Sequence, residues 1–562
     1  MKVLIIGGYG TFGFGMAERL SDEAGLELIL AGRNFDKAKA ACERLTGEAK
    51  FTPLKLDRNT LALDFKPDLI VDASGPFQAY DGVPVIEYCE THKIQYADIS
   101  DDGEFVKAVT KRANTDITLI SGLSTCPVLS AIGLREIEAR IGPAETVTIG
   151  IAPSPKADLG RNVVAAVASY AGQNTVPVQR QGQAQLAAGM TETRRETICV
   201  PGGLPLPSLP FALADAPDAL ALPQSFPALT DIWTGAGTRP VWLHMVLVQL
   251  SRFVARREKT SLAKYARLFH WGRGLFKYGV HRGGMFVRAA NKTGEASWHL
   301  IAEGDHGPRI PALPVVALIR KMLRSEVLPS GAYSGDEIIG LNDLAPEFAR
   351  LDITYGIQFD GAATPVYEKI MGDAYARFHP AIAELHRTGD KVRIFKGQCD
   401  VTRGRNPLSH IVAAIMGFPK SGTSVPVTVT VTPDSAGETW ERNFDGKTFS
   451  SHHSLGTGKW ARHITERFGS IRIQMAILEE AGKLRIDTRG WSLFGVPLPS
   501  FLKPAGDVYE TQDDKGRFVF HVDLKAPLFG RLCKYHGWLE PVEKASAKEI
   551  SPPTNGSPQT RA

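Results

Sequence analysis

Glycines near the start of the chain have the spacing and the setting of a phosphate-binding turn. They follow the apolar residues 3–6, which predict a buried strand, and precede a helical pattern at residues 16–20. A helix N-terminus presents unpaired N–H groups and the positive end of its dipole, and glycine lets a phosphate come close. The segment therefore predicts a dinucleotide site, the alternative being an ordinary tight turn. The predicted binding residues are Gly7, Gly8, Tyr9, Gly10, Thr11, Phe12 and Gly13.

The end of the second expected strand indicates which dinucleotide binds. Residues 26–31 predict this strand, and Arg33 and Asn34 follow it. An NAD site usually has Asp or Glu here for the ribose 2′-hydroxyl, whereas the guanidinium of Arg suits a 2′-phosphate. Arg33 therefore favours NADP over NAD, the alternative being a solvated surface arginine. Asp57 closes the third strand, where it would accept a hydrogen bond from adenine or cap a loop.

The hydrophobic patterns divide the chain into domains. Residues 1–135 alternate strands and helices, which predicts a parallel, Rossmann-like sheet with its ligand at the carboxyl ends of the strands. An α+β substrate or dimerisation domain is expected over 136–358, with its end packed back on the first domain. Residues 366–542 alternate apolar and polar residues and predict a mainly antiparallel β domain, in the form of a curved half-barrel, after a linker at 360–365. The Ser- and Pro-rich residues 543–562 predict a disordered tail. The fold class is α/β.

Segments of the first half resemble the saccharopine dehydrogenase-like reductase family. They are GGYGTFG, AGRN, VDASGPFQAYDGVPVIEYC, YADIS and SGLSTCPVLSAIG, within residues 1–355. The resemblance implies an NAD(P) reductase of unassigned substrate. It places the turn after the fourth strand beside the nicotinamide ribose, and Asp98 and Ser100 at the substrate cleft. The implied cofactor-binding residues of that turn, with the residue before it, are Ala73, Ser74, Gly75, Pro76 and Phe77.

Residues 366–540 resemble a bacterial domain of unknown function that is often fused to such reductases. The segments that carry this resemblance are WERNFDGKTFSS, the turn at Phe468 and Gly469, and YHGWLEP.

Reduction of an imine or carbonyl needs a proton donor besides the hydride. Tyr80, Asp98, Asp102 and Cys126 all lie at expected strand ends, and Tyr80 and Asp98 are taken as the catalytic candidates. Asp98 has a structural alternative, which is to cap the helix that starts near residue 103. No tyrosine has a lysine four residues later, so the Tyr-x-x-x-Lys acid of short-chain reductases is absent.

Charge, cysteine content and hydropathy indicate the cellular compartment and exclude some classes of site. The net charge of +5 is small for 562 residues, and the six cysteines form neither a CxxC pair nor a Cys/His cluster. This indicates a reducing cytoplasm and predicts neither disulfides nor a metal site. His452 and His453 are expected in a polar turn. No apolar run is long enough to span a membrane.

One segment concentrates the positive charge. Residues 241–290 contain ten Lys or Arg and one Glu, interleaved with apolar and aromatic residues. Such a pattern suits an interfacial helix on anionic lipid, and equally a core or dimer element with a solvated basic side. Nucleic acid is not expected, since no binding motif accompanies the charge.

Two functions fit these observations. The first is an NADP-dependent oxidoreductase that acts on a small-molecule or lipid substrate, either in the cytoplasm or at the inner membrane face. The second is a non-catalytic NADP sensor or scaffold whose C-terminal domain binds a partner or lipid.

Overall fold

The computed structural model describes residues 1–80, 82–112, 115–157, 161–257, 280–359, 365–387, 389, 391–415, 418–527 and 530–542. The chain forms two compact units. Unit 1 comprises Met1–Thr364, Lys369–Ala374 and Gly456–Arg462, and unit 2 comprises Pro365–Glu368, Tyr375–Leu455 and His463–Ala562. The expected linker falls almost entirely outside the described residues, and so does the expected tail.

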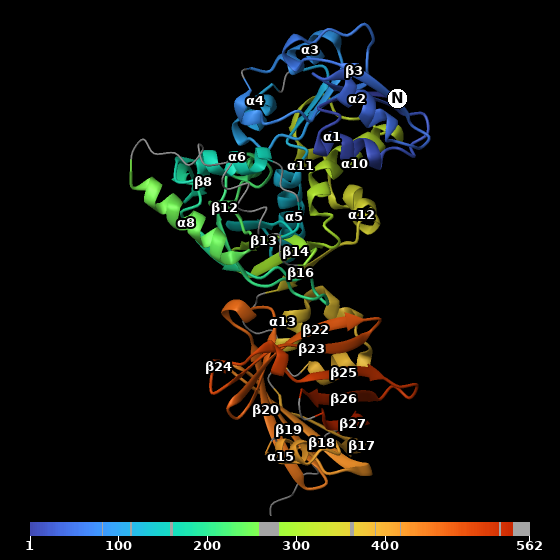
Figure 1. Ribbon diagram of the computed structural model, residues 1–562, viewed down its shortest axis with the longest axis vertical. Coiled ribbons are helices and arrows are strands. Elements are labelled where there is room, and N and C mark those ends of the chain that lie inside the picture. The colour runs from blue at the N-terminus through green and yellow to red at the C-terminus, as the bar shows by residue number, and fades with distance from the viewer. Residues whose placement is uncertain are drawn as a thin grey trace, which may run out of the picture. The chain divides into compact units, whose positions relative to one another are not determined.

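A seven-stranded parallel sheet begins unit 1, in the order β15-β6-β5-β4-β1-β2-β3 (Figure 1). Its inner strands are buried along nearly their whole length, as expected of parallel strands covered on both faces. The sheet confirms the predicted Rossmann-like fold, and its order reverses between β1 and β4, where such sheets bind ligands. The strands are β1 Lys2–Ile6, β2 Glu27–Gly32, β3 Lys50–Lys55, β4 Leu69–Asp72, β5 Gln95–Asp98, β6 Thr118–Ser121 and β15 Gly331–Ser334. The helices between them are α1 Thr11–Arg19, α2 Phe35–Glu43, α3 Pro84–His92 and α4 Gly103–Thr110.

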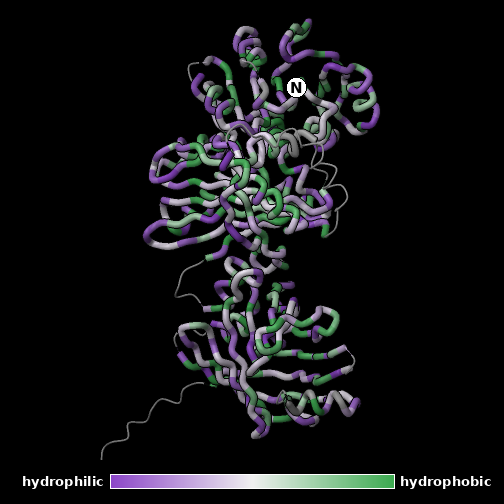
Figure 2. The backbone as a smooth tube through the Cα atoms, turned by 60° about the vertical axis from the view of Figure 1, so that its left-hand side comes forward, coloured by the Kyte–Doolittle hydropathy of each residue, from purple (hydrophilic) through white to green (hydrophobic). Residues whose placement is uncertain are grey.

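A second, mixed sheet follows in unit 1, in the order β10-β11-β12-β7-β13-β14-β16, with β8 and β9 beside β12. Helix α5 (Ser130–Ile141) leads into it and packs so closely that a Cβ at Gly133 would lie 2.8 Å from Val287. Val71 and Trp298, from the two sheets, therefore belong to one continuous hydrophobic core. Figure 2 shows apolar stretches along the inner strands of this unit. The strands are β7 Thr146–Ala152, β8 Asn174–Arg180, β9 Gln183–Ala188, β10 Thr193–Glu196, β11 Leu209–Leu213, β12 Asp231–Ala236, β13 Gly283–Ala290, β14 Glu295–Ala302 and β16 Ile353–Phe359. The other helices are α6 Arg161–Tyr170, α7 Asp218–Ser225, α8 Val241–Ala255, α10 Leu313–Leu323, α11 Gly335–Ile338 and α12 Leu341–Arg350.

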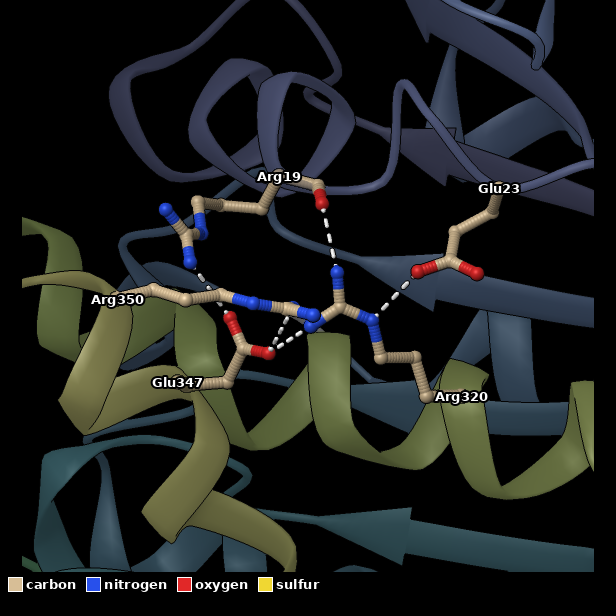
Figure 3. Close-up of polar contacts among 5 residues, drawn as sticks. All are labelled: Arg19, Glu23, Arg320, Glu347 and Arg350. Carbon is tan, nitrogen blue, oxygen red and sulfur yellow. Dashed lines mark hydrogen bonds and ion pairs between the residues drawn. The ribbon is translucent and has the colours of Figure 1, made fainter.

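A buried ionic cluster fastens the helix after the glycine turn to later helices (Figure 3). The carboxylate of Glu347 on α12, 2% exposed, pairs with Arg19 at the end of α1 at 2.9 Å and with Arg350 at 3.0 Å, and it also contacts Arg320 of α10. Arg320 in turn pairs with Glu23 at 2.6 Å and donates a hydrogen bond to the Arg19 carbonyl at 3.0 Å. Helices α10 and α12, which both lie some 300 residues further along the chain, thus hold α1 in place.

The basic segment 241–290 is not one helix. Residues 241–255 form α8, residues 258–279 lie outside the described part of the chain, and residues 283–290 form the largely buried strand β13. The interfacial interpretation is therefore wrong for the end of the segment, because β13 pairs with both β7 and β14.

Unit 2 is built around an antiparallel barrel. Ten strands follow one another around the sheet, and the pairing of β22 with β23 makes it a closed ring, whereas the sequence predicts a half-barrel. Asp445 and Gly446 form the tight turn between β19 and β20, both with positive φ, the conformation that Asp-Gly favours in a two-residue hairpin. The ring strands are β17 Arg393–Arg403, β18 Gly422–Asp434, β19 Gly437–Phe444, β20 Lys447–Leu455, β21 Ile464–Phe468, β22 Ile471–Glu480, β23 Lys483–Leu493, β25 Ala505–Gln512, β26 Phe518–Ala526 and β27 Gly530–Pro541; β24 Val496–Pro497 extends the edge of β23. The helix α15 Pro407–Ile415 connects β17 and β18.

The barrel interior contains a polar cluster. His453 lies in β20 and is 3% exposed, not in the polar turn expected for it, and its ring bonds the Tyr367 hydroxyl at 3.1 Å and Glu466 at 3.0 Å. Burial alone would raise the pKa of Glu466, but His453 and Arg442 hold that pKa at about 2. Tyr367 lies on the first of three short helical segments that precede the barrel strands; Gly372, with φ +45°, and Pro380 separate them. The segments are α13 Val366–Met371, a 3₁₀ helix Gly372–Arg377 and α14 Pro380–His386.

Candidate functional site

The glycine turn lies against the end of β4, at the point where the sheet order reverses. Gly7 has φ +80°, and a Cβ there would lie 2.7 Å from the Ala73 carbonyl oxygen and 2.9 Å from the Cα of Ser74. A Cβ at Gly13 would lie 2.8 Å from the Cα of Gly8 and would collide with the Gly7 carbonyl. These glycines are required by close backbone approach, which leaves a cradle of main chain where the sheet order reverses, the place where such sheets bind ligands.

Helix α1 begins at this cradle with an open N-terminus. Gly10 is its N-cap and provides no side-chain hydrogen bond, and its first turn contains no acidic residue. The N–H groups of a helix's first turn point out of its N-terminus, so those of Thr11 and Phe12 face the glycine turn. An uncapped N-terminus without a nearby carboxylate suits an anion such as a pyrophosphate.

The end of β2 contributes an aromatic ring and an arginine. The Tyr9 ring lies over Gly32, where a Cβ would be 2.7 Å from the ring carbon Cζ, and the Tyr9 hydroxyl accepts a hydrogen bond from the N–H of Asn34 at 3.2 Å. Arg33 is exposed, and no hydrogen bond or ion pair engages it within the described chain. The Asn34 side chain caps α2 by accepting from Lys37 at 2.9 Å, so its amide has a structural partner already.

The end of β3 supplies one predicted residue and one that sequence reasoning missed. Asp57 caps the short 3₁₀ helix Arg58–Thr60 by accepting from the N–H of Asn59 at 3.0 Å. Arg58, the next residue, has a largely buried guanidinium that pairs with Asp72 at 3.2 Å. One sign in the sequence indicates that Arg58 belongs to the site, which is its position next to a strand end. Its partner, Asp72, lies on β4, fourteen residues later.

A polar chain leads from Arg58 to the catalytic candidate Tyr80. Asp72, fully buried at the end of β4, accepts hydrogen bonds from the N–H of Ser74 at 3.0 Å and from its hydroxyl at 2.6 Å. Because the Ser74 hydroxyl donates to Asp72, the Tyr80 hydroxyl 2.7 Å away must donate to Ser74. The Arg58 guanidinium also lies over the Tyr80 ring, 3.1 Å from its centroid, and Phe77 packs against that ring in a tilted arrangement with the centroids 4.8 Å apart. The turn after β4 thus contributes Ser74 to the hydrogen-bonded row and Phe77 to the packing around Tyr80.

Burial determines which of the hydrogen-bonded side chains Asp72 and Tyr80 keep a proton. It raises the pKa of Asp72, against the opposing effects of Arg58 and of the hydrogen bonds from Ser74. It also raises the pKa of Tyr80, as does the nearby Asp72 carboxyl, so the phenol keeps its proton at neutral pH.

The other catalytic candidate, Asp98, lies beside Asp72 in the sheet register and is fully buried. Its Oδ1 accepts hydrogen bonds from the Ser100 N–H at 2.9 Å, the Ser121 hydroxyl at 3.0 Å and the Gly122 N–H at 2.9 Å, whereas Oδ2 has no hydrogen-bond partner. Burial raises the pKa of Asp98 to about 6, although these hydrogen bonds oppose the shift. Its carboxyl therefore titrates close to the range in which a general acid or base operates.

The residues after Asp98 are held by local bonds. Asp102, not Asp98, caps α4 by accepting from the N–H of Glu104 at 3.0 Å, so the capping alternative for Asp98 is wrong. The buried Ser100 hydroxyl accepts from the N–H of Asp102 at 3.1 Å. Cys126 is 6% exposed and burial raises the pKa of its thiol, which is therefore neutral.

The structure thus brings most predicted residues together at one edge of the sheet. The glycine turn, Ala73 and Ser74 adjoin one another, and the neighbouring strand ends hold Tyr80 and Asp98. Gly75 is half-buried and Pro76 exposed beside them. Within the described residues no His, Cys, Asp or Glu cluster could hold a metal ion, and no helix is both long and apolar enough to cross a bilayer.

Two sequence families match this chain. Residues 3–120 match the saccharopine dehydrogenase NADP-binding domain, and residues 378–539 match a domain of unknown function, DUF4166. Both matches confirm the resemblance inferred from the sequence, and the first supports NADP as the cofactor of the Rossmann-like domain. No curated protein matches the chain.

Several solved structures are remotely similar to it. Apo saccharopine dehydrogenase (L-Glu forming) from Saccharomyces cerevisiae is 11% identical, over 64% of this chain and 100% of that one, with a TM-score of 0.42. A probable dehydrogenase from Thermotoga maritima is 12% identical over 62% and 97%, with a TM-score of 0.33. A secretory abundant heat soluble protein from Ramazzottius varieornatus is 8% identical over 26% and 91%, with a TM-score of 0.16. Likenesses this remote say nothing of what the chain binds.

Proposed function

We propose that this protein is an NADP-dependent oxidoreductase that transfers a hydride to or from an imine, carbonyl or alkene. The glycine cradle between β1 and β4, within a domain that matches an NADP-binding family, is the observation that supports it. When bound, the cofactor supplies the hydride chemistry, and the protein binds and orients the reactants.

The residues present fit this cofactor. The uncapped N-terminus of α1 suits its pyrophosphate, and the exposed guanidinium of Arg33 at the end of β2 suits a ribose 2′-phosphate. A preference for NADP over NAD follows from Arg33, because an acidic residue in its place would be required to bind a free 2′-hydroxyl.

Tyr80 is proposed as the proton donor. Its phenol stays protonated at neutral pH, and its hydroxyl bonds Ser74, which bonds Asp72. For the transfer, the Tyr80 O–H turns from Ser74 to the substrate. Ser74 then gives its proton to the phenolate and takes one from a protonated Asp72, since burial raises the pKa of that carboxyl, and Asp72 regains a proton from solvent. Asp98, with a pKa of about 6, is proposed to hold or exchange a proton one strand away.

The cellular setting is proposed from the sequence and the thiols. All six cysteines are free, which supports the reducing cytoplasm. The partner is proposed to be a small-molecule or lipid substrate and not nucleic acid, and a homodimer is left open. The association with lipid rests on helix α8, which lies outside this site.

A substrate panel with two matched variants tests the proposal. NADPH oxidation is followed by absorbance with aldehydes, ketones, enones and amine–oxoacid mixtures. We expect turnover with one class, and we expect Tyr80→Phe to lower it at least about tenfold without changing the Kd for NADPH. Ser74→Ala should lower turnover as well, since it interrupts the same chain.

A non-catalytic NADP sensor is the second candidate. It is favoured by the fact that the Tyr80 proton already points to Ser74 and that Asp98 is fully buried. Tight NADPH binding without oxidation by any substrate class, with Tyr80→Phe unchanged in every respect, would support the sensor and overturn the enzyme.

A further inference from the structure

Helix α8 has its apolar and polar residues on unexpected sides. The face packed on unit 1 includes His244 and Ser251, 3% and 0% exposed. The opposite face presents four large apolar side chains, spaced by four, four and three residues and therefore aligned along the helix. They are Trp242, Val246, Leu250 and Phe253, exposed by 54%, 47%, 39% and 50%.

This apolar stripe is a contiguous surface at the rim of unit 1. Figure 1 shows α8 at the outer side of this unit, where it packs against β11. Its inner side belongs to the core through Val248 and Val254. Single exposed apolar residues are common on proteins, but an aligned row of four is typical of a surface that binds a membrane or another molecule.

Positive charge stands at the end of the same helix. Arg256 and Arg257 are both exposed, and the Arg257 guanidinium lies 4.3 Å over the ring of Phe253, the last residue of the stripe. The sequence continues with five more Lys or Arg and one Glu among residues 258–279, together with five aromatic residues other than His. The apolar stripe thus adjoins the exposed Arg256 and Arg257, which directly follow the last residue of α8.

We propose that α8 docks unit 1 on an anionic lipid bilayer, with the apolar stripe in the headgroup–acyl boundary and the arginines on the anionic headgroups. An apolar face with a Lys/Arg-rich flank and interleaved aromatic residues is what an interfacial helix requires. Nucleic acid would leave the stripe uncovered, and a second copy of the chain would leave the positive charge without a counterpart. The proposal goes beyond the oxidoreductase proposal and does not depend on it.

Unit 2 provides a matched control for nonspecific adsorption of exposed apolar side chains to vesicles. The turn around β24 exposes Phe494 by 79% and Phe501 by 74%, comparable apolar surface without a pair of adjacent exposed arginines. If any exposed apolar group were enough for adsorption to vesicles, these two phenylalanines would contribute as much as the stripe of α8.

Sedimentation with vesicles tests the proposal on the full chain. One set contains phosphatidylcholine alone, and the other contains about one third phosphatidylglycerol. We expect binding to the anionic set only, at about 0.1 M salt, and its loss at about 1 M salt, where the screening length falls from about 10 Å to about 3 Å. Each Lys or Arg near the surface contributes about fivefold to binding.

Three variants distinguish the outcomes. The Val246→Ser, Leu250→Ser, Phe253→Ser triple variant and the Arg256→Glu, Arg257→Glu double variant should each weaken binding at least about tenfold, since each removes one half of the surface. Phe494→Ser with Phe501→Ser should change binding less than about twofold. Equal NADPH affinity and circular dichroism in all variants shows that each is folded.

Several results would overturn the docking surface. One is wild-type protein that ignores anionic vesicles at low salt. Another is binding lost only in the Phe494 and Phe501 variant, which would assign adsorption to the barrel. A third is a wild-type dimer that the serine triple variant converts to a monomer while vesicle binding is absent, which would assign the stripe to a second copy of the chain.

Discussion

The ionic cluster that fastens α1 predicts how much of the stability of unit 1 depends on one carboxylate. Glu347→Gln keeps the shape of the side chain but removes the charge that Arg19 and Arg320 share (Figure 3). Both arginines are more than four-fifths buried, and burial lowers the pKa of each, which shows that their charges are poorly solvated. Removing one partner from a buried ionic network costs about 3–5 kcal/mol.

The same helix provides the control. Glu18 on α1 pairs with Arg309 at 3.7 Å, with both side chains nearly half exposed, so Glu18→Gln should cost less than about 1 kcal/mol. The assay is calorimetric unfolding, in which the transition that NADPH shifts upward reports unit 1. A loss for Glu347→Gln no greater than that for Glu18→Gln would refute the claim that the cluster holds α1.

Three further outcomes are expected. Gly13→Ala should lower the free energy of unfolding by about 1–3 kcal/mol and weaken NADPH binding, because its Cβ would collide with the glycine turn. Gly15→Ala on the same helix, where a Cβ would meet nothing within 4 Å, should raise that free energy by up to about 1 kcal/mol. Denaturant titration with and without NADPH measures both. Asp98 keeps a proton in the folded state between about pH 4 and 6 that the unfolded chain releases, so its contribution to stability is present below that window and declines as pH rises through it, by about 3 kcal/mol. Asp98→Asn should flatten this part of the stability profile, and an unchanged slope would contradict the raised pKa. Glu466→Gln, which removes the carboxylate shared by His453 and Arg442, should lower the melting temperature of the barrel transition and leave the NADPH-sensitive transition in place.

Local pattern was enough for the parts of the site that are contiguous in sequence. A strand, a glycine turn and a helix follow one another within residues 2–19, so their geometry is readable from spacing alone. The turn at Ser74 is likewise adjacent to the strand that positions it. Period-2 alternation similarly predicted the strands of unit 2, because each has one face on the barrel interior.

Contacts between distant segments were not readable in the same way. Arg58 reaches Asp72 across the sheet edge, and strand β15 joins β6 after some 210 residues with only four residues of its own. His453 looked like part of a turn because its partners, Tyr367 and Glu466, stand far from it in the sequence. The barrel likewise depends on the pairing of β17 with β27, in which Arg403 lies opposite Cys533 and Phe395 opposite Pro541, far apart in the sequence.

The most direct test of the central claim is a comparison of NADPH and NADH affinity in the wild-type protein and in Arg33→Ala, by fluorescence titration. A charge-assisted pair with the 2′-phosphate is worth about 1.5–3 kcal/mol, so the wild type should prefer NADPH by about ten- to a hundredfold. Arg33→Ala should lose most of that preference, and Lys39→Ala, an exposed cation on α2, should keep it. Equal affinity of the wild type for both nucleotides, or a preference that survives Arg33→Ala, would contradict the account.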